Sequence, residues 1–376
     1  MPDPILDEIN LTTLKEIYPR VIRDNFFLDT PFLAYMRAQS LVPFGGGSEM
    51  HNTFLYAPMI GGFYKKGQNF NITKRPTLAG MKFVPKYVYV SVPEYKEDIQ
   101  VINKGPLAVF SLIDTDLKNA MNTITAKVAV SLMNHGQAAG TGVDSDRSEF
   151  INGIIEALND GLTEGWTGDR FPTYGEATRN GVVGSALNSE PLWVGKADGT
   201  TGPINFAVLE ESYQSCTIGK EEPNIGVGNK HVISLIKEIL APMQRFAQEK
   251  DPVYGVHSFR FNNAMILKDD YFPSARYGVN DPELGNYKVA DFTSENTTKG
   301  ANSNLPVNTL IKAGEVFCWF NTSTWLMRIS DDEEYGFGFS GFVPAQDNTR
   351  VVGQIKAALN LECTAPRLNK QLFGIA

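Results

Sequence analysis

One long amphipathic pattern constrains the fold of this chain more than any other feature. Between residues 106 and 134, apolar side chains recur at steps of three and four with polar residues between them, which predicts a helix with a single apolar stripe. Gly105-Pro106 provides a start, because proline at the first helical position lacks only an N–H that would have no partner. Asn134-His135-Gly136 provides an end. The stripe consists of Leu107, Phe110, Ile113, Leu117, Met121, Ile124, Val128 and Leu132.

A helix over residues 106–134 is about 43 Å long at roughly 1.5 Å per residue, so it is expected to act as a spine for neighbouring elements. Further helices are predicted over residues 150–158, 206–216 and 231–248, the last with a kink near Pro242. Residues 350–364 alternate apolar and polar side chains, which predicts a strand with one buried face. Because helices and strands are segregated along the chain, the predicted class is α+β.

Residues 1–47 are expected to form an N-terminal arm. Large apolar residues lie close together there in a stretch that prolines interrupt, so they need a surface on the rest of the molecule or on another chain. Of these two alternatives we favour a neighbouring subunit. The residues expected to make this contact are Phe26, Phe27, Phe32 and Leu33.

Residues 48–92 are expected to form an extended hairpin loop. Two β-rich stretches, 53–56 and 81–92, flank a polar excursion of about 25 residues, and loops of that length are usually functional or disordered. An isolated two-stranded hairpin is marginal in water, which favours a position on a neighbour. The hairpin residues expected to meet acidic groups of another subunit are Lys65, Lys66, Lys74 and Arg75.

Charge and composition exclude several classes of protein. Lys and Arg number 34 against 42 Asp and Glu, a net charge of −8, which disfavours a sequence-independent DNA-binding surface. No apolar run approaches the roughly 18 residues of a membrane helix, and the start of the chain lacks the pattern of a signal peptide. Three widely spaced cysteines indicate no disulfide framework, which fits a reducing cytoplasm.

No catalytic, cofactor-binding or metal-binding residues are predicted. The four histidines show no metal-ligand spacing, and Gly226-Val227-Gly228 lacks the third glycine of a dinucleotide fingerprint. Ser340 is surrounded by glycines, but Phe342 occupies the final glycine position of a nucleophile elbow. The acidic run 331–334 lacks the spacing of a calcium loop, so a solvated turn is the better interpretation.

The order of parts and several local segments resemble the major capsid proteins of tailed double-stranded-DNA bacteriophages, which have the Hong Kong 97-like fold. An arm, a long hairpin, a spine helix, a loop-rich middle and returning strands follow one another in the same order. The similarity covers nearly the whole chain. The similar segments are FPTYGEATR at 171–179 followed by Leu192-Trp193, SYQSC at 212–216 followed by Pro223-Asn224, LAPMQRF at 240–246 and LNLECTAPRL at 359–368.

The resemblance implies a division into domains and a function. The peripheral domain would comprise residues 93–150 and 330–376 and carry the spine helix, while residues 151–329 would form the axial domain. The chain would self-assemble as hexamers and pentamers into an icosahedral shell around double-stranded DNA, without reading the DNA sequence. It would thus be a virion protein, assembled in the host cytoplasm.

Partners beyond other copies of the chain are also implied: scaffolding and portal proteins, and in some relatives decoration proteins. Some relatives begin with a charged scaffolding region, and none is visible before Leu11, so a separate scaffold or prior removal is expected. Two alternatives stay open. One is a bacterial nanocompartment shell, which shares the fold but encloses enzymes, and the other is an enzyme with an unrecognised site.

Overall fold

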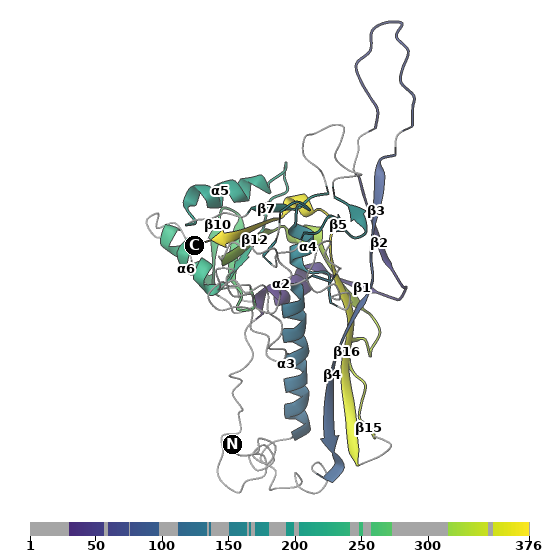
Figure 1. The fold of residues 1–376 in the computed structure, drawn as a ribbon, viewed down its shortest axis with the longest axis vertical. Coiled ribbons are helices and arrows are strands. Elements are labelled where there is room, and N and C mark those ends of the chain that lie inside the picture. Colours follow the sequence, from purple (N-terminus) through teal and green to yellow (C-terminus); the bar gives the residue numbers. More distant parts are fainter. Residues whose placement is uncertain are drawn as a thin grey trace, which may run out of the picture.

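The computed structural model describes the following residues: 30–55, 59–74, 76–97, 112–133, 135–136, 150–163, 165–166, 170–179, 193–198, 203–240, 248–250, 257–272, 315–344 and 349–375. Together they form an elongated molecule in which one long helix runs beside a long two-stranded ribbon, with a second sheet to one side (Figure 1). No helix among these residues has the length and apolar character that crossing a bilayer requires.

The predicted spine is helix α3, Leu112–Leu132, and residues 106–111 of the expected start lie outside the described ranges. Ile124, Val128 and Leu132 of the stripe are buried. Met121, by contrast, is 41% exposed, so its assignment to the buried face is wrong. The buried residues Ala120, Ile124 and Val128 follow one another at steps of four, and Met121 lies about 100° around the helix from Ala120, at the edge of this face.

A six-stranded sheet is built around the long strand β16, Arg350–Cys363. Its neighbours are antiparallel to it, and the outermost strand β1 is parallel to β13. The other strands of the sheet are β1 (Leu41–Phe44), β4 (Lys86–Tyr95), β13 (Trp325–Ser330), β14 (Gly336–Phe339) and β15 (Val343–Pro344). Strands β4 and β16 form the ribbon, which is in register from Arg350 opposite Tyr95 to Leu359 opposite Lys86.

The predicted strand over 350–364 is confirmed, but its description as half-buried holds only for the first half. From Arg350 to Ala357 burial alternates along β16, with one face toward α3. From Ala357 to Cys363 every residue is buried, including the polar Asn360 and Glu362. Polar spacing marks one face of a strand, but it does not show whether another layer covers that face.

The second sheet has seven strands in the order β7-β17-β12-β8-β11-β10-β9. Helices α5 (Phe206–Ser215) and α6 (Lys230–Leu240) pack on it around a second apolar core. The strands are β7 (Lys196–Asp198), β8 (Ile225–Gly228), β9 (Gln248–Lys250), β10 (His257–Phe261), β11 (Ala264–Lys268), β12 (Glu315–Phe320) and β17 (Lys370–Ile375).

The predicted helices are present but shorter than expected. The helix over 206–216 is confirmed as α5, and α6 ends at Leu240, so the expected kink near Pro242 lies outside the described residues. The helix over 150–158 is reduced to α4, Ile154–Leu158. Short elements connect the rest: β5 (Thr173–Tyr174), β6 (Ala177–Thr178), and the 3₁₀ turns η4 (Thr322–Thr324) and η5 (Pro366–Leu368).

The chain passes between the two sheets at points that differ from the expected domain limits. Strand β13 ends at Ser330 yet belongs to the six-stranded sheet, whereas β17 pairs with β12 in the seven-stranded sheet. The strand pairing therefore places residues 325–329 with the ribbon and residues 370–375 with the second sheet. The assignment of peripheral and axial domains otherwise stays a prediction.

Candidate assembly surfaces

The extended hairpin is present, with β2 (Met50–Leu55) antiparallel to β3 (Leu78–Phe83). The expected second stretch, 81–92, is divided, because residues from Lys86 onward belong to β4 and pair with β16. Its distal loop projects beyond the body of the molecule (Figure 1). The side chain of Phe63 is fully exposed, at 106% of its reference area. A contiguous group of exposed apolar side chains is typical of a surface that binds another macromolecule. The exposed apolar residues of this loop and its flanks, here called the tip residues, are Leu55, Met59, Ile60, Phe63, Tyr64, Phe70, Ile72 and Leu78.

The end of this loop has local order of its own. The backbone N–H of Gln68 donates to the carbonyl of Lys65 at 3.0 Å, and the N–H of Lys65 donates to Oε1 of Gln68 at 3.0 Å. Gly67 has a φ of +87°, which other residues adopt only with strain. The rings of Tyr64 and Phe70 meet edge to face with centroids 4.9 Å apart. The tip therefore presents a defined turn.

Three of the four hairpin charges predicted to contact another subunit can be located. Lys65, Lys66 and Lys74 are exposed on the distal loop, and Arg75 lies outside the described residues. The structure leaves their intersubunit role a prediction. The sequence analysis missed the tip residues, because it interpreted this segment as a polar excursion. The signal that could have revealed them is the number of large apolar residues between Leu55 and Leu78.

Stacking and backbone contacts hold the base of the hairpin on the body. The ring of Phe54 stacks on Trp193, with centroids 4.1 Å apart and planes 7° from parallel. The N–H of Lys82 donates to the carbonyl of Gly175 at 3.0 Å. Gly175 has a φ of +58°, and a Cβ at this position would lie 2.9 Å from Cβ of Met81. The residue is thus a glycine because β3 passes so close to it.

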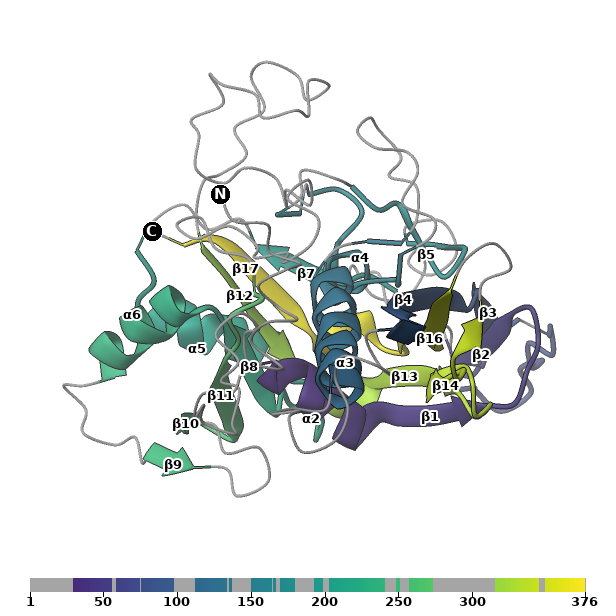
Figure 2. The same cartoon turned by 90° about the horizontal axis from the view of Figure 1, so that it is seen from below.

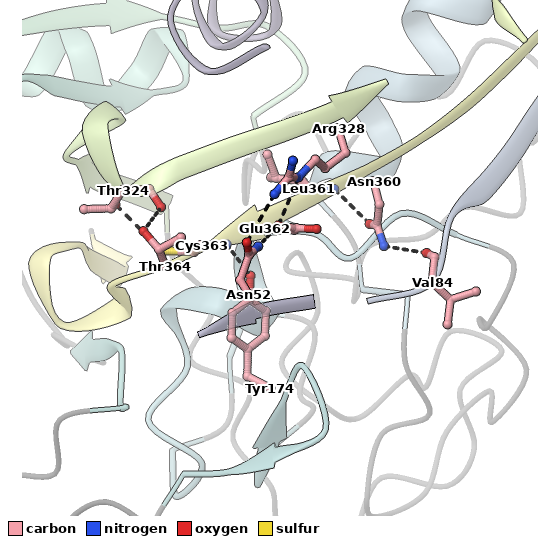
Figure 3. A network of polar contacts seen from close by, with 10 residues as sticks. All are labelled: Asn52, Val84, Tyr174, Thr324, Arg328, Asn360, Leu361, Glu362, Cys363 and Thr364. Carbon is pink, nitrogen blue, oxygen red and sulfur yellow. Dashed lines mark hydrogen bonds and ion pairs between the residues drawn. The ribbon is translucent and has the colours of Figure 1, made fainter. Parts of the chain in front are cut away.

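A buried carboxylate connects the hairpin base to the six-stranded sheet (Figure 3). Glu362 on β16 is completely buried, and its Oε2 accepts hydrogen bonds from Asn52 of β2 and from Nε of Arg328 at 3.4 Å. Arg328 on β13 also donates from Nη2 to Oδ1 of Asn52 at 3.2 Å. Burial raises the pKa of Glu362, while the charge of Arg328 and the hydrogen bonds from Arg328 and Asn52 lower it. The other oxygen, Oε1, has no hydrogen-bond partner among the residues that the structure describes.

A second polar cluster lies beside it on β16 (Figure 3). Asn360 donates from Nδ2 to the carbonyl of Val84 at 2.8 Å and to Oδ1 of Asn152 at 2.8 Å, and its Oδ1 accepts the N–H of Asn152 at 2.9 Å. The hydroxyl of Tyr174 accepts the N–H of Cys363 at 2.8 Å. These bonds explain why polar residues occupy the buried half of β16. They also fix the connection between β3 and β4 to the sheet.

The arm differs from its prediction. Helix α2, Pro31–Ser40, packs inside the subunit, where Phe32 is 1% exposed and its ring lies 4.9 Å from that of Phe320. Leu33 is buried in the same core. The prediction that these two residues pack on a neighbouring subunit is therefore wrong, because α2 finds its apolar partners on β12 and β13. Phe26 and Phe27 lie outside the described residues.

The outer face of the ribbon carries exposed aromatic side chains that sequence analysis did not single out. Tyr87, Tyr89 and Tyr95 alternate with the inward-facing valines of β4 and are about half or more exposed. The ring of Tyr87 contacts Tyr335 edge to face, with centroids 6.3 Å apart. Nζ of Lys356 lies 5.6 Å from the centre of the Tyr335 ring. This face is a second candidate contact surface.

Within the described part of the chain, no group of His, Cys, Asp and Glu side chains is placed to hold a metal ion. The three cysteines are free and buried, and burial raises the pKa of Cys216 to about 11 and that of Cys363 to about 12. The acidic run 331–334 forms a turn in which Oδ1 of Asp332 accepts the N–H of Glu334 at 2.9 Å. The candidate sites in the described part of the chain are therefore the two exposed surfaces, the hairpin tip and the outer face of the ribbon.

Comparison with known proteins identifies the fold. No protein-family model and no curated protein matches the sequence. Among solved structures, a capsid subunit of cyanophage A-1(L) aligns over 96% of this chain and 97% of its own, with a TM-score of 0.61 and 12% identity. The capsid of an empty GTA particle aligns over 96% of both chains, with a TM-score of 0.59 and 10% identity.

A third similar structure is the encapsulin of Synechococcus elongatus PCC 7942. It aligns over 100% of this chain and 96% of its own, with a TM-score of 0.56 and 9% identity. These similarities show that the chain has the Hong Kong 97-like capsid fold, so the predicted α+β class and fold are confirmed.

Proposed function

We propose that this chain is the major capsid protein of a tailed bacteriophage, a structural protein that self-assembles as hexamers and pentamers into an icosahedral shell around double-stranded DNA. The fold alone supports a shell protein, because capsid subunits of phages and of a GTA particle share it. The observation that carries the proposal is the hairpin tip. It exposes a group of apolar side chains at a distance from the subunit's own cores.

The tip residues are proposed to pack on a neighbouring copy of the chain. Burying one large apolar side chain contributes about 1.5–3 kcal/mol. Exposed ion pairs contribute roughly 0–1 kcal/mol each. The apolar residues would therefore supply most of the contact energy, while Lys65, Lys66, Lys74 and Arg75 would meet acidic groups and help to set orientation. Phe26 and Phe27 of the arm are proposed to contact a neighbour as well.

The remaining parts of the proposal concern partners and location. A shell that encloses a genome needs an entry point, so portal and scaffolding proteins are proposed partners, with a decoration protein as a further one. The acidic net charge of −8 suits a wall that encloses DNA without binding its sequence. The protein would reside in the virion after assembly in the host cytoplasm, and we propose no enzymatic activity for it.

A bacterial nanocompartment shell is the second candidate, and the similarity to the encapsulin of Synechococcus elongatus favours it specifically. The two candidates differ in cargo. A phage head encloses nucleic acid, whereas a nanocompartment encloses enzymes. Neighbouring genes for a portal and a terminase would support the first candidate, and a gene for a cargo enzyme would support the second.

The test is to express the full chain, separate it by size-exclusion chromatography and image the large fractions by electron microscopy. Closed shells with six-fold and five-fold capsomers are expected, if necessary after addition of a scaffolding protein. A chain that stays monomeric with a candidate scaffold present contradicts the proposal. Shells that recruit a cargo enzyme in place of nucleic acid would favour the nanocompartment.

A matched pair of variants tests the role of the tip. Replacing Phe63 by Ser should leave the stability of the subunit unchanged, because this side chain is already in water. Loss of about 2 kcal/mol per contact should raise the subunit concentration needed for assembly about thirtyfold. Leu162→Ser, at another exposed apolar residue of the body, serves as the control. An equal effect of both variants would contradict a specific role of the tip.

A further inference from the structure

Arg179 places a positive charge in the interior of the subunit. Among the lysine and arginine side chains that the structure describes, that of Arg179 alone is fully buried. Burial lowers the pKa of its guanidinium to about 10, so the group still carries its charge at neutral pH. Charged side chains are almost never fully buried without partners. The groups that surround this guanidinium must therefore be arranged to hold it.

The partners of the guanidinium are backbone carbonyls from three segments of the chain. Nε donates to the carbonyl of Phe171 at 2.8 Å, Nη2 donates to that of Glu156 in α4, and Nη1 donates to that of Trp193 at 3.5 Å. Buried carbonyls need donors, and arginine supplies several of them in a rigid planar fork. One side chain thus connects α4, residue 171 and residue 193.

Arg179 also closes the loop 171–179, here called the brace, which contains β5 and β6. Its backbone N–H donates to the carbonyl of Pro172 at 3.0 Å. Its Cζ lies over the ring of Tyr174, 5.3 Å from the ring centre, within the range of a cation–π contact. Backbone and side chain of one residue therefore hold both ends of the brace together.

The brace contacts strand β3 of the extended hairpin. Strand β5 lies next to β3 in both views of the molecule (Figure 1 and Figure 2). The ring of Tyr174 meets that of Phe83 edge to face, with centroids 5.2 Å apart. The N–H of Lys82 donates to the carbonyl of Gly175, so this donor of β3 bonds to the brace and not to β2.

Trp193 connects the brace to the other strand of the hairpin. Its Nε1 donates to the carbonyl of Tyr174 at 3.2 Å, and the two rings have centroids 5.7 Å apart. Its ring is fully buried and stacks on Phe54 of β2. Both strands at the hairpin base therefore rest on groups that Arg179 holds in place.

We infer that Arg179 is a positioning residue for the hairpin: its guanidinium fixes the brace and Trp193 to each other, and through them it fixes both strands at the hairpin base. The brace and the hairpin base then open as one unit. Because the tip residues lie on the same hairpin, Arg179 also determines the direction in which they are presented. The inference concerns a single unassembled subunit, so it does not depend on the proposed function.

Residue-resolved hydrogen exchange of the unassembled wild-type chain tests whether the two parts open together. The N–H of Arg179 reports on the brace and that of Lys82 on the hairpin base, since each bonds to a carbonyl of the brace. Their opening constants should agree within about threefold and should depend on urea in the same way. A hairpin base that opens about tenfold more often than the brace would overturn the inference.

A matched pair of variants tests the guanidinium itself. Arg179→Lys keeps the positive charge but lacks the planar fork that reaches three carbonyls. Loss of one hydrogen bond from a charged donor should raise the opening constant of the Lys82 amide at least about tenfold relative to that of Val227 in the second sheet. The control is Ile236→Ala, which leaves a cavity in the second core and should lower overall stability without raising this ratio.

The outcomes separate positioning from general stabilisation. A ratio that Arg179→Lys leaves unchanged, or that Ile236→Ala raises equally, would overturn the inference, because Arg179 would then stabilise the whole subunit and not the hairpin base. If Arg179→Lys does not fold, the two wild-type opening constants still decide the question, since they need no variant.

Discussion

Removing the charge of Arg328 should destabilise the subunit in a way that depends on pH. Arg328→Gln leaves Glu362 buried without a cationic partner, since the described contacts of its Oε2 are with Arg328 and Asn52. Loss of one partner of a buried pair costs about 3–5 kcal/mol, and the 19% exposure of the Arg328 side chain places the expected cost near the lower end.

The pH dependence follows from the direction of the pKa shift. Burial already raises the pKa of Glu362, and loss of Arg328 should raise it further. Folding then retains a proton that the unfolded chain releases above about pH 4.5. The stability of Arg328→Gln should therefore fall as pH rises from about 4.5, and its deficit relative to wild type should be larger at pH 8 than at pH 4.5.

Urea unfolding of unassembled subunits at these two pH values measures the effect. Glu362→Gln removes the fully buried charge and leaves Arg328, which is partly exposed, so it should cost less than Arg328→Gln. The double variant should be close to Glu362→Gln alone, so the cycle gives the coupling energy. Lys356→Gln is the control, because its 2.7 Å ion pair with Glu334 is more exposed. An equal deficit at both pH values, or additive single variants, would refute the account of Glu362 as a buried charge held by Arg328.

Three further predictions concern the fold. Ile124→Asp should prevent soluble folding, because it buries an unpaired carboxylate. Met121→Asp, at an exposed residue of α3, should change the thermal unfolding temperature little. Similar effects of the two variants would contradict the observed faces of the helix. Gly175→Ala should cost at least about 1–2 kcal/mol in urea unfolding because of its φ of +58°, and should loosen the hairpin base in hydrogen exchange; wild-type protection there would be the opposing result. Phe32→Ala should lower subunit stability by about 3–5 kcal/mol, so deletion of residues 1–35 should impair the fold itself, as circular dichroism would report.

The sequence was sufficient to predict the elements whose pattern is local. The spacing of Ile124, Val128 and Leu132 predicted the spine, and the alternation along 350–357 predicted one face of β16. These predictions succeed because the period of a helix or strand is fixed by the backbone. Met121 shows the limit: its spacing fits the apolar stripe, but the buried face runs through Ala120, Ile124 and Val128 and leaves Met121 at its edge.

Long-range contacts were not accessible from the sequence. Asn360 and Glu362 have the spacing of an exposed face, and only the packing of the hairpin base and residues 150–179 against β16 buries them. Phe32 looked free of partners because Phe320 is distant in the sequence. The sequence predicted a long loop with exposed lysines at the tip. It did not show that the apolar side chains of this loop are exposed too, because that depends on whether the folded chain places a core against them.

Strand β16 has a mechanical consequence. It runs the length of the ribbon and continues through η5 into β17 of the second sheet, so residues 350–375 join the two sheets by covalent bonds. A tensile load applied at the far end of the ribbon acts along β16, and the ladder of pairs with β4 then bears it in shear, all together rather than one after another. The part of the load that the ladder does not take up is carried along the backbone of residues 350–375, so tension at the end of the ribbon reaches the second sheet through covalent bonds.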